Sequence, residues 1–259
     1  MIKPYLDVFL KYWGLIVYLA KTQVSLKYRR SYLGLLWSLL NPLLTMVIMT
    51  IVFSTMFKNS RENFPIYLMC GRLIFGFNQE ATKSALNSVV GNASLIKKIY
   101  VPKYVFPMSE CIASLVNMLF SLIALLIVMI FTHLEFKWTM LLFWVPLLYV
   151  FLFALGIGLI LSAINVFFRD IKHLYDVFLV LWMYLTPIFY PVTSLSDDLR
   201  RLMGLNPMYH YIVMLRGMFL DGVLPTMSEN LICLGMGLAT IAVGLVFFKK
   251  TQDRFILFI

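Results

Sequence analysis

GNASLIKKIYVPKYVFP, residues 91–107, is the longest basic, proline-punctuated connector between apolar runs in this chain. It follows the second of six apolar segments, and most of the remaining sequence is apolar enough to lie in a bilayer. A soluble partner therefore has few places at which to act on the protein. The sequence predicts that residues 91–107 form one of them, as a loop on the cytoplasmic side of a membrane.

The composition excludes an ordinary soluble protein. Of the 259 residues, 61% are hydrophobic and 13% are charged, and the mean hydropathy is +0.88. A soluble domain of this length needs a more polar surface, because the buried fraction rises only slowly with size. Long apolar runs are typical of transmembrane helices. We therefore expect an all-α integral membrane protein, folded as a single domain over residues 1–259.

The net charge of +10 does not indicate nucleic-acid binding. The Lys and Arg residues lie at the ends of apolar runs, which is typical of topology signals, and they form no continuous basic face. The three cysteines lie in apolar sequence without CxxC spacing, so neither a disulfide framework nor a zinc site is expected. No metal site is predicted in this chain.

Residues 1–30 carry a polar stripe at intervals near 3.6 residues, which predicts an amphipathic helix. Their one charge-free run, residues 12–20, is about 14 Å long as a helix and cannot cross a hydrocarbon core of ~30 Å. We expect a helix in the membrane plane, or a short helix packed on its own domain; the two are compatible. Its anchors are expected to be Trp13 at headgroup depth and Lys27, Arg29 and Arg30 on the cytoplasmic side.

The apolar runs predict six membrane spans, at residues 31–57, 64–90, 108–131, 139–165, 174–191 and 230–248. Gly156 and Gly158 would permit close helix approach in the fourth. Most of the 22 Lys and Arg residues fall on the cytoplasmic side if both termini lie there. The prediction is thus a multi-pass protein of the cytoplasmic (inner) membrane with both termini cytoplasmic.

Residues 193–229 are too long for a turn and too apolar for an ordinary loop. They predict two short helices, one opening with Asp197 and Asp198, the other with Asn206 as N-cap. Apolar half-helices beside a span indicate a re-entrant hairpin that dips into the outer leaflet between the fifth and sixth spans.

The second span, residues 64–90, is unusual because it carries Arg72, Glu80 and Lys83. If it enters near its Pro65 end, Glu80 lies ~22 Å deep, just past the middle of the bilayer. An ionised group there costs roughly 2.5–3.5 kcal/mol, so it faces a bundle interior or a wet cavity. Glu80 and Lys83 are one turn apart and are expected partly to neutralise each other. A structural ion pair between helices and a pore-lining role are equally supported.

Several catalytic signatures are absent from the sequence. Without a GxxxxGK[ST] loop the chain does not cradle nucleotide phosphates, and no HExxH or GxSxG motif occurs. Asp197 and Asp198 could hold a metal with a sugar diphosphate, although acids at a helix start explain them better. Transport is therefore favoured over catalysis, and we expect no enzymatic activity from the chain alone.

Five motifs in matching order resemble a known family. They are LG..W....P at residues 33–42, N.SLIKK..VP....P at 92–107, N.FFRDI at 165–171, TP..Y at 186–190, and Asn206-Pro207 with Tyr209. The chain resembles, over nearly its whole length, the membrane subunit of ABC-2 type polysaccharide exporters, which export O-antigen, capsular polysaccharide, teichoic acid and rhamnose-rich glycans.

The resemblance implies a homodimer of permeases, two copies of a separate ATPase subunit that binds ATP and Mg, and a continuous pore between the permeases. The short amphipathic stretch in residues 91–107 suits a groove on that partner. The implied ATPase-coupling residues are Asn92, Leu95, Ile96, Lys97, Lys98, Ile99, Arg169 and Asp170. The helix of residues 1–30 is expected to gate the entry of lipid.

The expected substrate is a lipid-linked polysaccharide, which would meet polar and aromatic side chains. Aromatic faces suit sugar C–H surfaces, although each aromatic residue alone is more simply a packing or belt residue. The pore candidates are Arg72, Phe75, Phe77, Glu80, Tyr184, Phe189 and Tyr190. The alternatives are an ABC-2 permease for a drug or a lipid, and a membrane-embedded glycosyl or phosphoryl transferase that uses Asp197 and Asp198.

Overall fold

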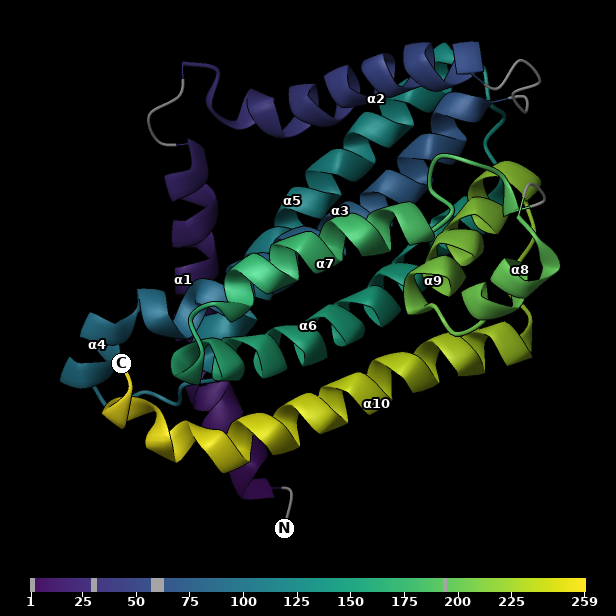
Figure 1. Ribbon diagram of the computed structural model, residues 1–259. Helices are drawn as coiled ribbons and strands as arrows, with labels where there is room; N and C mark the ends of the chain where they lie inside the picture. The colour runs from purple at the N-terminus through teal and green to yellow at the C-terminus, as the bar shows by residue number, and fades with distance from the viewer. Residues whose placement is uncertain (1–2, 29–31, 57–62, 193–194) are drawn as a thin grey trace.

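The computed structural model describes residues 3–28, 32–56, 63–192 and 195–259, and across these ranges all regular secondary structure is helical (Figure 1). The elements are α1 (Lys3–Tyr28), η1 (Gly34–Leu36), α2 (Trp37–Met56), α3 (Phe64–Gly91), α4 (Ala93–Lys98), α5 (Val105–Phe131), η2 (Trp138–Leu142), α6 (Trp144–Phe167), α7 (Ile171–Leu185), α8 (Asp197–Met203), α9 (Pro207–Arg216), η4 (Gly217–Asp221), α10 (Met227–Thr251) and η5 (Gln252–Leu257).

The six longer helices after α1 alternate in direction along the chain: α2, α5 and α7 run one way, and α3, α6 and α10 run back (Figure 1). Helix α3 contacts both α5 and α6, and α6 contacts α10. At one end of the bundle lie α4, the α6–α7 turn and η5, and we call this the α4 end. At the other lie α8, α9 and η4, the α8 end. Helix α1 runs across the long helices at the α4 end and packs against α5.

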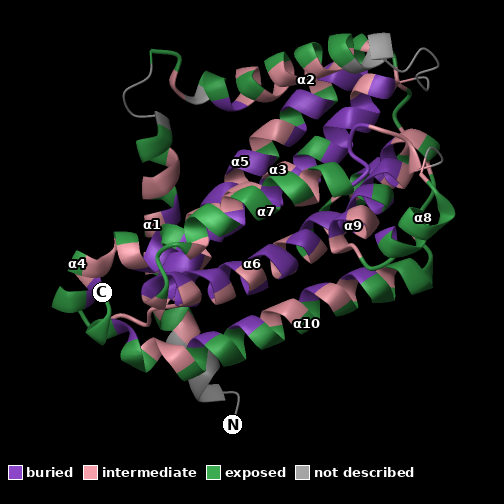
Figure 2. Cartoon of the chain, in the orientation of Figure 1, coloured by how far each residue is buried: buried purple, intermediate pink, exposed green. Residues whose placement is uncertain are grey.

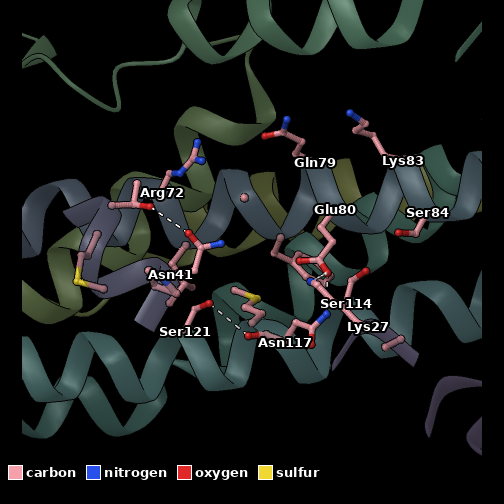
Figure 3. A pocket seen from close by; sticks show the side chains of 18 of the residues that line it. Lys27, Asn41, Arg72, Gln79, Glu80, Lys83, Ser84, Ser114, Asn117 and Ser121 are labelled. Atoms are coloured by element: carbon pink, nitrogen blue, oxygen red, sulfur yellow. Dashed lines mark hydrogen bonds and ion pairs between the residues drawn. The ribbon is translucent and has the colours of Figure 1, made fainter. Parts of the chain in front are cut away.

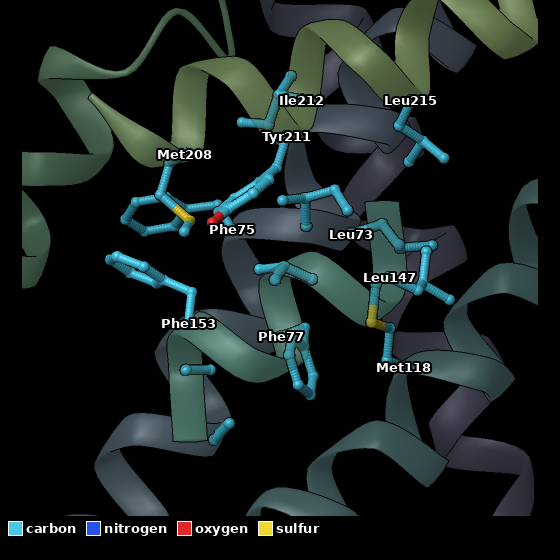
Figure 4. Close-up of a cluster of buried hydrophobic side chains, with 14 of the residues drawn as sticks. Leu73, Phe75, Phe77, Met118, Leu147, Phe153, Met208, Tyr211, Ile212 and Leu215 are labelled. Carbon is cyan, nitrogen blue, oxygen red and sulfur yellow. The ribbon is translucent and has the colours of Figure 1, made fainter. Parts of the chain in front are cut away.

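The core lies along α3 and α6, which are mostly buried, whereas exposed residues lie along α1, α2 and α10 (Figure 2). Helix α9 extends this core at the α8 end, because its Met208, Tyr211 and Ile212 point toward α3 and α6 (Figure 4). The Tyr211 ring lies 6.0 Å from that of Phe153. Its hydroxyl donates to the carbonyl of Cys233 on α10 at 3.2 Å, so one side chain joins three helices.

Helices α6 and α10 approach closely at two glycines. A Cβ on Gly244 would lie 2.5 Å from the carbonyl oxygen of Gly156, and a Cβ on Gly156 would lie 2.4 Å from the carbonyl carbon of Thr240. Gly158 faces α3, where its Cβ would lie 2.8 Å from that of Ala85. The predicted role of Gly156 and Gly158 in close packing is confirmed.

The apolar helices are those of an integral membrane protein. In the described part of the chain, three helical stretches have the length and hydropathy of a membrane span: Val105–Phe131, Trp138–Phe167 and Met227–Leu257. Trp37–Val52 is apolar but shorter. The all-helical fold is thus confirmed, whereas the count of six spans stays a prediction.

The fifth predicted span differs most from the helix that forms there. Helix α7 has 15 residues, about 22 Å as a helix, and ends at Leu185 instead of continuing to residue 191. Thr186 is extended, with ψ 131°, because the residue before a proline disfavours helical geometry. Pro187 and Pro191 also lack the N–H group that a continuing helix needs.

Candidate functional site

A cavity of about 730 Å³ with a mixed polar and apolar lining lies between α1, α2, α3 and α5, and we call it the central cavity (Figure 3). Its polar lining is Gln23, Lys27, Asn41, Thr45, Arg72, Gln79, Glu80, Lys83, Ser84, Glu110, Ser114, Asn117 and Ser121. A second cavity of about 450 Å³, the inner cavity, reaches Gly91 and Asn92 at the α4 end. The two share Gln23, Lys83, Ser84 and Glu110, so the polar lining is continuous between them.

Helix α3 builds one wall of the central cavity through its periodicity. Arg72, Gln79 and Lys83 recur at spacings of seven and four, with Gly76 between them, which places them on one face. The buried residues of α3 are mostly small or apolar, with Asn78 as an exception. The charges that made residues 64–90 unusual in the sequence therefore lie on the cavity side of the helix.

Glu80 is the centre of a polar network in this cavity. Its Oε1 lies 2.7 Å from the Lys27 Nζ of α1 and accepts a hydrogen bond of 2.6 Å from the Asn117 Nδ2 of α5. Both members of the ion pair are partly exposed, so the pair is only partly desolvated. The Asn117 Oδ1 is buried and has no hydrogen-bond partner among the described residues. Glu80 thus forms an interhelical ion pair and also lines the central cavity, whereas its pore-lining role stays a prediction.

Lys83 does not neutralise Glu80, contrary to the expectation from their spacing. Its Nζ lies 2.7 Å from the Asp176 Oδ1 of α7, and this pair joins α3 to α7. The sequence analysis missed Asp176 because its partner is 93 positions away in the chain. Its only local signal is an acid in the second turn of α7, just before the apolar remainder of that helix.

Four of the seven pore candidates line the central cavity: Arg72, Phe77, Glu80 and Phe189. The guanidinium of Arg72 contacts the Met183 sulfur at 3.6 Å.

The other three candidates lie elsewhere. Phe75 is buried against Trp182, with ring centroids 6.0 Å apart. Tyr184 is exposed on α7, and Tyr190 donates its hydroxyl to the Tyr184 carbonyl at 2.8 Å.

The expected anchors of the N-terminal helix are only partly described. Trp13 is exposed on α1, with its ring centroid 5.7 Å from that of Phe9. Lys27 turns into the central cavity toward Glu80 instead of outward. Arg29 and Arg30 lie outside the described residues.

The predicted coupling residues gather at the α4 end. Lys97, Lys98 and Ile99 are exposed at the end of α4, whereas Ile96 is buried and Leu95 partly so. Asn92 donates its side-chain amide to the Ser88 carbonyl at 2.7 Å, which joins α4 to the last turn of α3. Arg169 and Asp170 are exposed in the α6–α7 turn at the same end of the bundle.

Lys103 in the same connector is a contact that the sequence analysis missed. Its Nζ donates to the Gln252 carbonyl of η5 at 2.6 Å and lies 5.7 Å from the ring centroid of Phe255, which is fully buried. Burial lowers the pKa of Lys103, and the nearby Asp253 carboxylate opposes that shift. Residues 91–107 are thus tied to the last turn of the chain.

Asp197 and Asp198 open α8, as predicted for helix-start acids. Asp197 lies 3.8 Å from Arg200 one turn on, and both carboxylates are exposed. In the part of the chain that the structure describes, no cluster of three or more His, Cys, Asp or Glu residues could hold a metal ion.

The family model of the ABC-2 type transporter matches residues 14–220, which include every residue that lines the two cavities. The chain belongs to the ABC-2 type transporter family. The resemblance that the five motifs indicated is therefore confirmed.

This ABC-2 chain is similar over nearly its whole length to named permeases. It is 30% identical over 252 residues to the O-antigen export system permease protein RfbA of Myxococcus xanthus, covering 95% of both chains. It is 28% identical to an RfbA protein of Klebsiella pneumoniae over 94% of both. The capsule polysaccharide export inner-membrane protein CtrC of Neisseria meningitidis is 25% identical, over 85% of this chain and 87% of that protein. These relatives are named as membrane components of export systems and not as enzymes.

Proposed function

We propose that this chain is the permease subunit of an ATP-driven exporter that moves a lipid-linked polysaccharide, of the O-antigen, teichoic acid or capsule type, across the cytoplasmic membrane. The observation that carries the proposal is the end-to-end similarity to O-antigen export permeases. Membership of the ABC-2 family supports the proposal that a separate subunit hydrolyses the ATP. The permease itself is non-enzymatic.

The proposed path for the glycan is the lining of the two cavities. Along α3 it extends from Leu68 to Gly91, about 35 Å of helix and comparable to the ~30 Å hydrocarbon core. Amide and hydroxyl side chains on α2 and α5 offer hydrogen bonds to sugar hydroxyls. Phe77 and Phe189 offer aromatic faces to sugar C–H surfaces.

The proposed topology has six spans, with the α4 end and both termini in the cytoplasm. Alternation in the direction of six helices supports it, and so does the exposed lysine pair at the α4 end. Helix α1 crosses the bundle at that end, as an in-plane helix should. Helices α8 and α9 form the re-entrant hairpin on the outer side, with the apolar face of α9 buried in the bundle.

The proposed assembly is two permeases with two copies of an ATPase subunit, which would hold ATP and Mg. Helix α4 is the contact for the ATPase, because its Lys97 and Lys98 are exposed while Ile96 fixes it to the bundle. Asn92 joins α4 to α3, so movement of α4 reaches the wall of both cavities. ATP-driven closure of the partner would in this way move α3.

Reconstitution of the permease with its ATPase subunit tests the function. We expect the lipid-linked glycan of the source cell to stimulate ATP hydrolysis and to appear in the lumen of inside-out proteoliposomes. Stimulation by a drug or a simple lipid, but not by the glycan, would contradict the proposal. So would metal-dependent glycosyl or phosphoryl transfer by the permease alone that is lost in Asp197→Asn.

The same system tests the coupling contact. We expect Lys97→Glu with Lys98→Glu to abolish export, because two charges are reversed in the proposed ATPase contact, while the permease still inserts. Glycan transport and ATP hydrolysis are measured on the same vesicles. The control is Lys250→Glu with Arg254→Glu, an equal change of charge on exposed residues at the same end of the bundle. Equal export by both double variants would refute the assignment of α4.

A further inference from the structure

The chain leaves its helical path in residues 186–191, between α7 and the α8 end. This 186–191 segment is buried, because Thr186 and Ile188 are fully inaccessible and Phe189 nearly so. Because the segment is not helical, its Pro187 and Ile188 carbonyl groups do not have the N–H donors that a continuing helix would provide. In a buried setting such groups need other donors, since an unpaired carbonyl is costly.

Arg216, the last residue of α9, supplies those donors. Its Nη1 donates to the Pro187 carbonyl at 2.8 Å and its Nη2 to the Ile188 carbonyl at 2.9 Å. The Nε donates to the Tyr67 carbonyl of α3 at 3.1 Å, and the guanidinium carbon lies 3.4 Å from the centroid of the Tyr67 ring. The side chain is 5% exposed, so one guanidinium joins α3, α9 and the 186–191 segment inside the protein.

Two further contacts hold the ends of the segment. Asn206, the N-cap of α9, donates its Nδ2 to the Thr186 Oγ1 at 3.0 Å and accepts from the Trp182 Nε1 at 3.0 Å. The Tyr67 hydroxyl donates to the Tyr190 carbonyl at 3.0 Å. Both ends of the segment are thus tied to a neighbouring helix, and Arg216 holds its middle.

Phe189 follows immediately after the two carbonyls that Arg216 holds, and it lines the central cavity. Toward the α8 end, the α3 lining is apolar at Leu68, Met69 and Leu73, and Arg72 lies among them. The polar groups Glu80, Ser114 and Asn117 lie further toward the α4 end. An apolar side chain such as Phe189 can close a pathway by excluding water where it narrows the path.

We propose that Arg216 is a positioning residue that holds Phe189 across the α8 end of the central cavity and so keeps this end closed to water. Without the guanidinium, the carbonyls of Pro187 and Ile188 lose their donors and satisfy themselves with water from the α8 side. The segment then moves outward and takes Phe189 with it. The proposal rests on the proposed function in one respect, namely that the α8 end is the exit side of the transport path.

A thiol reporter inside the cavity tests the closure. Ser121→Cys places a cysteine in the lining, and the native Cys70, Cys111 and Cys233 are buried. Full-length protein in right-side-out vesicles is treated with a membrane-impermeant maleimide, and the modified position is identified by peptide mass. We expect slow modification of residue 121 alone, and a rate about tenfold higher or more when Arg216→Met is added, because the loss of a charge-assisted hydrogen bond shifts a closed–open equilibrium by at least that factor.

Arg201→Met is the matched control, since Arg201 is exposed on α8 at the same end. It should leave the rate unchanged. Arg216→Lys keeps the positive charge but cannot make all three hydrogen bonds of the guanidinium. Tyr67→Phe keeps the ring and removes the hydroxyl that donates to Tyr190. Both variants should therefore give intermediate rates. If Arg216→Met fails to insert, the labelling rates of residue 121 in these two variants test the closure instead. Unchanged rates in inserted variants, or an increase only when the reagent is on the α4 side, would overturn the proposal.

The reporter needs neither ATP nor glycan. A failure of glycan-stimulated hydrolysis together with faster labelling in Arg216→Met would therefore reject the proposed substrate and keep the closure by Phe189. Normal glycan export together with unchanged labelling would keep the proposed substrate and reject the closure by Phe189.

Discussion

Glu80 collects two donors on one carboxylate oxygen, Lys27 from the crossing helix α1 and Asn117 from α5. The ion pair is partly exposed, so its coupling is expected to be about 1 kcal/mol or less. Its role is positional, because it sets where the end of α1 lies against the cavity.

A charge swap tests this tie. Lys27→Glu puts two carboxylates together, and we expect it to lower export. Lys27→Glu with Glu80→Lys restores the attraction and should recover export by up to about fivefold over Lys27→Glu alone, the limit set by the coupling energy. Transport in proteoliposomes is the measurement, and Lys21→Glu on the exposed face of α1 is the control. Equal export by the single and double variants would show that the pair does not act.

At this scale the sequence predicts the kind of residue but not its partner. The charges in residues 64–90 correctly indicated a polar wall, since no other environment accommodates them in an apolar helix. The partners of Glu80 and Lys83 could not be found because they come from α1 and α7, 53 and 93 positions away. The helical spacing rule names only neighbours within a turn.

At the scale of elements, the α6–α10 contact restricts the sequence most tightly, because Gly156 and Gly244 leave no room for a side chain. Gly244→Ala would place a methyl group 2.5 Å from the Gly156 carbonyl oxygen, and backbone must move to admit it. We expect a loss of about 1–3 kcal/mol of stability, the range for overpacking. The matched control is Gly235→Ala on the same helix, where a Cβ meets open space. Thermal unfolding in detergent compares the two, and equal midpoints would contradict close packing at Gly244.

Helix starts were more predictable than helix ends. The N-cap at Asn206 followed from an Asn-Pro pair, and the acids that open α8 followed from their fit to a helix N-terminus. Helix α7 ends at Leu185 because Thr186 precedes a proline, a local signal that was present in the sequence. The predicted span continued to residue 191 because the residues after Leu185 are also apolar. Hydropathy indicates that a segment is buried, but it does not indicate whether its backbone is helical. Arg216 shows why the run could be buried without being helical.

For the whole molecule, the two ends of the bundle predict a labelling pattern. Single cysteines at Lys97 in α4 and Leu257 in η5 should react from the cytoplasmic side, and one at Leu199 in α8 from the outer side. All three native side chains are exposed, so a difference in labelling reports the side of the membrane and not the burial of the residue. Impermeant maleimide on intact cells and on inverted vesicles gives the measurement. Reaction of residue 97 from outside the cell would refute the proposed topology and, with it, the ATPase contact at α4.

The large-scale arrangement was the most predictable part of the molecule. Apolar runs indicate where the helices lie along the chain, because the bilayer imposes a minimum length on each span. The six-span count and the orientation that the basic residues indicate stay predictions. The cavity between α1, α2, α3 and α5 could not be predicted, since it depends on how far α2 lies from α3 and α5. Phe77 and Phe75 illustrate the limit: they are two residues apart in one helix, and only Phe77 lines the cavity.

The one-sided packing of α10 has a consequence for how this protein tolerates genetic variation. Gly237 and Gly244, seven residues apart, are buried against α6, whereas Leu238, Val243 and Val246 are exposed to the surroundings of the bundle. In a saturation library across α10, the exposed positions should accept nearly any hydrophobic substitution and reject charge. The glycine positions should reject even alanine. Among the surviving clones, the positions that tolerate no substitution would then be spaced seven residues apart, at the glycines that pack against α6.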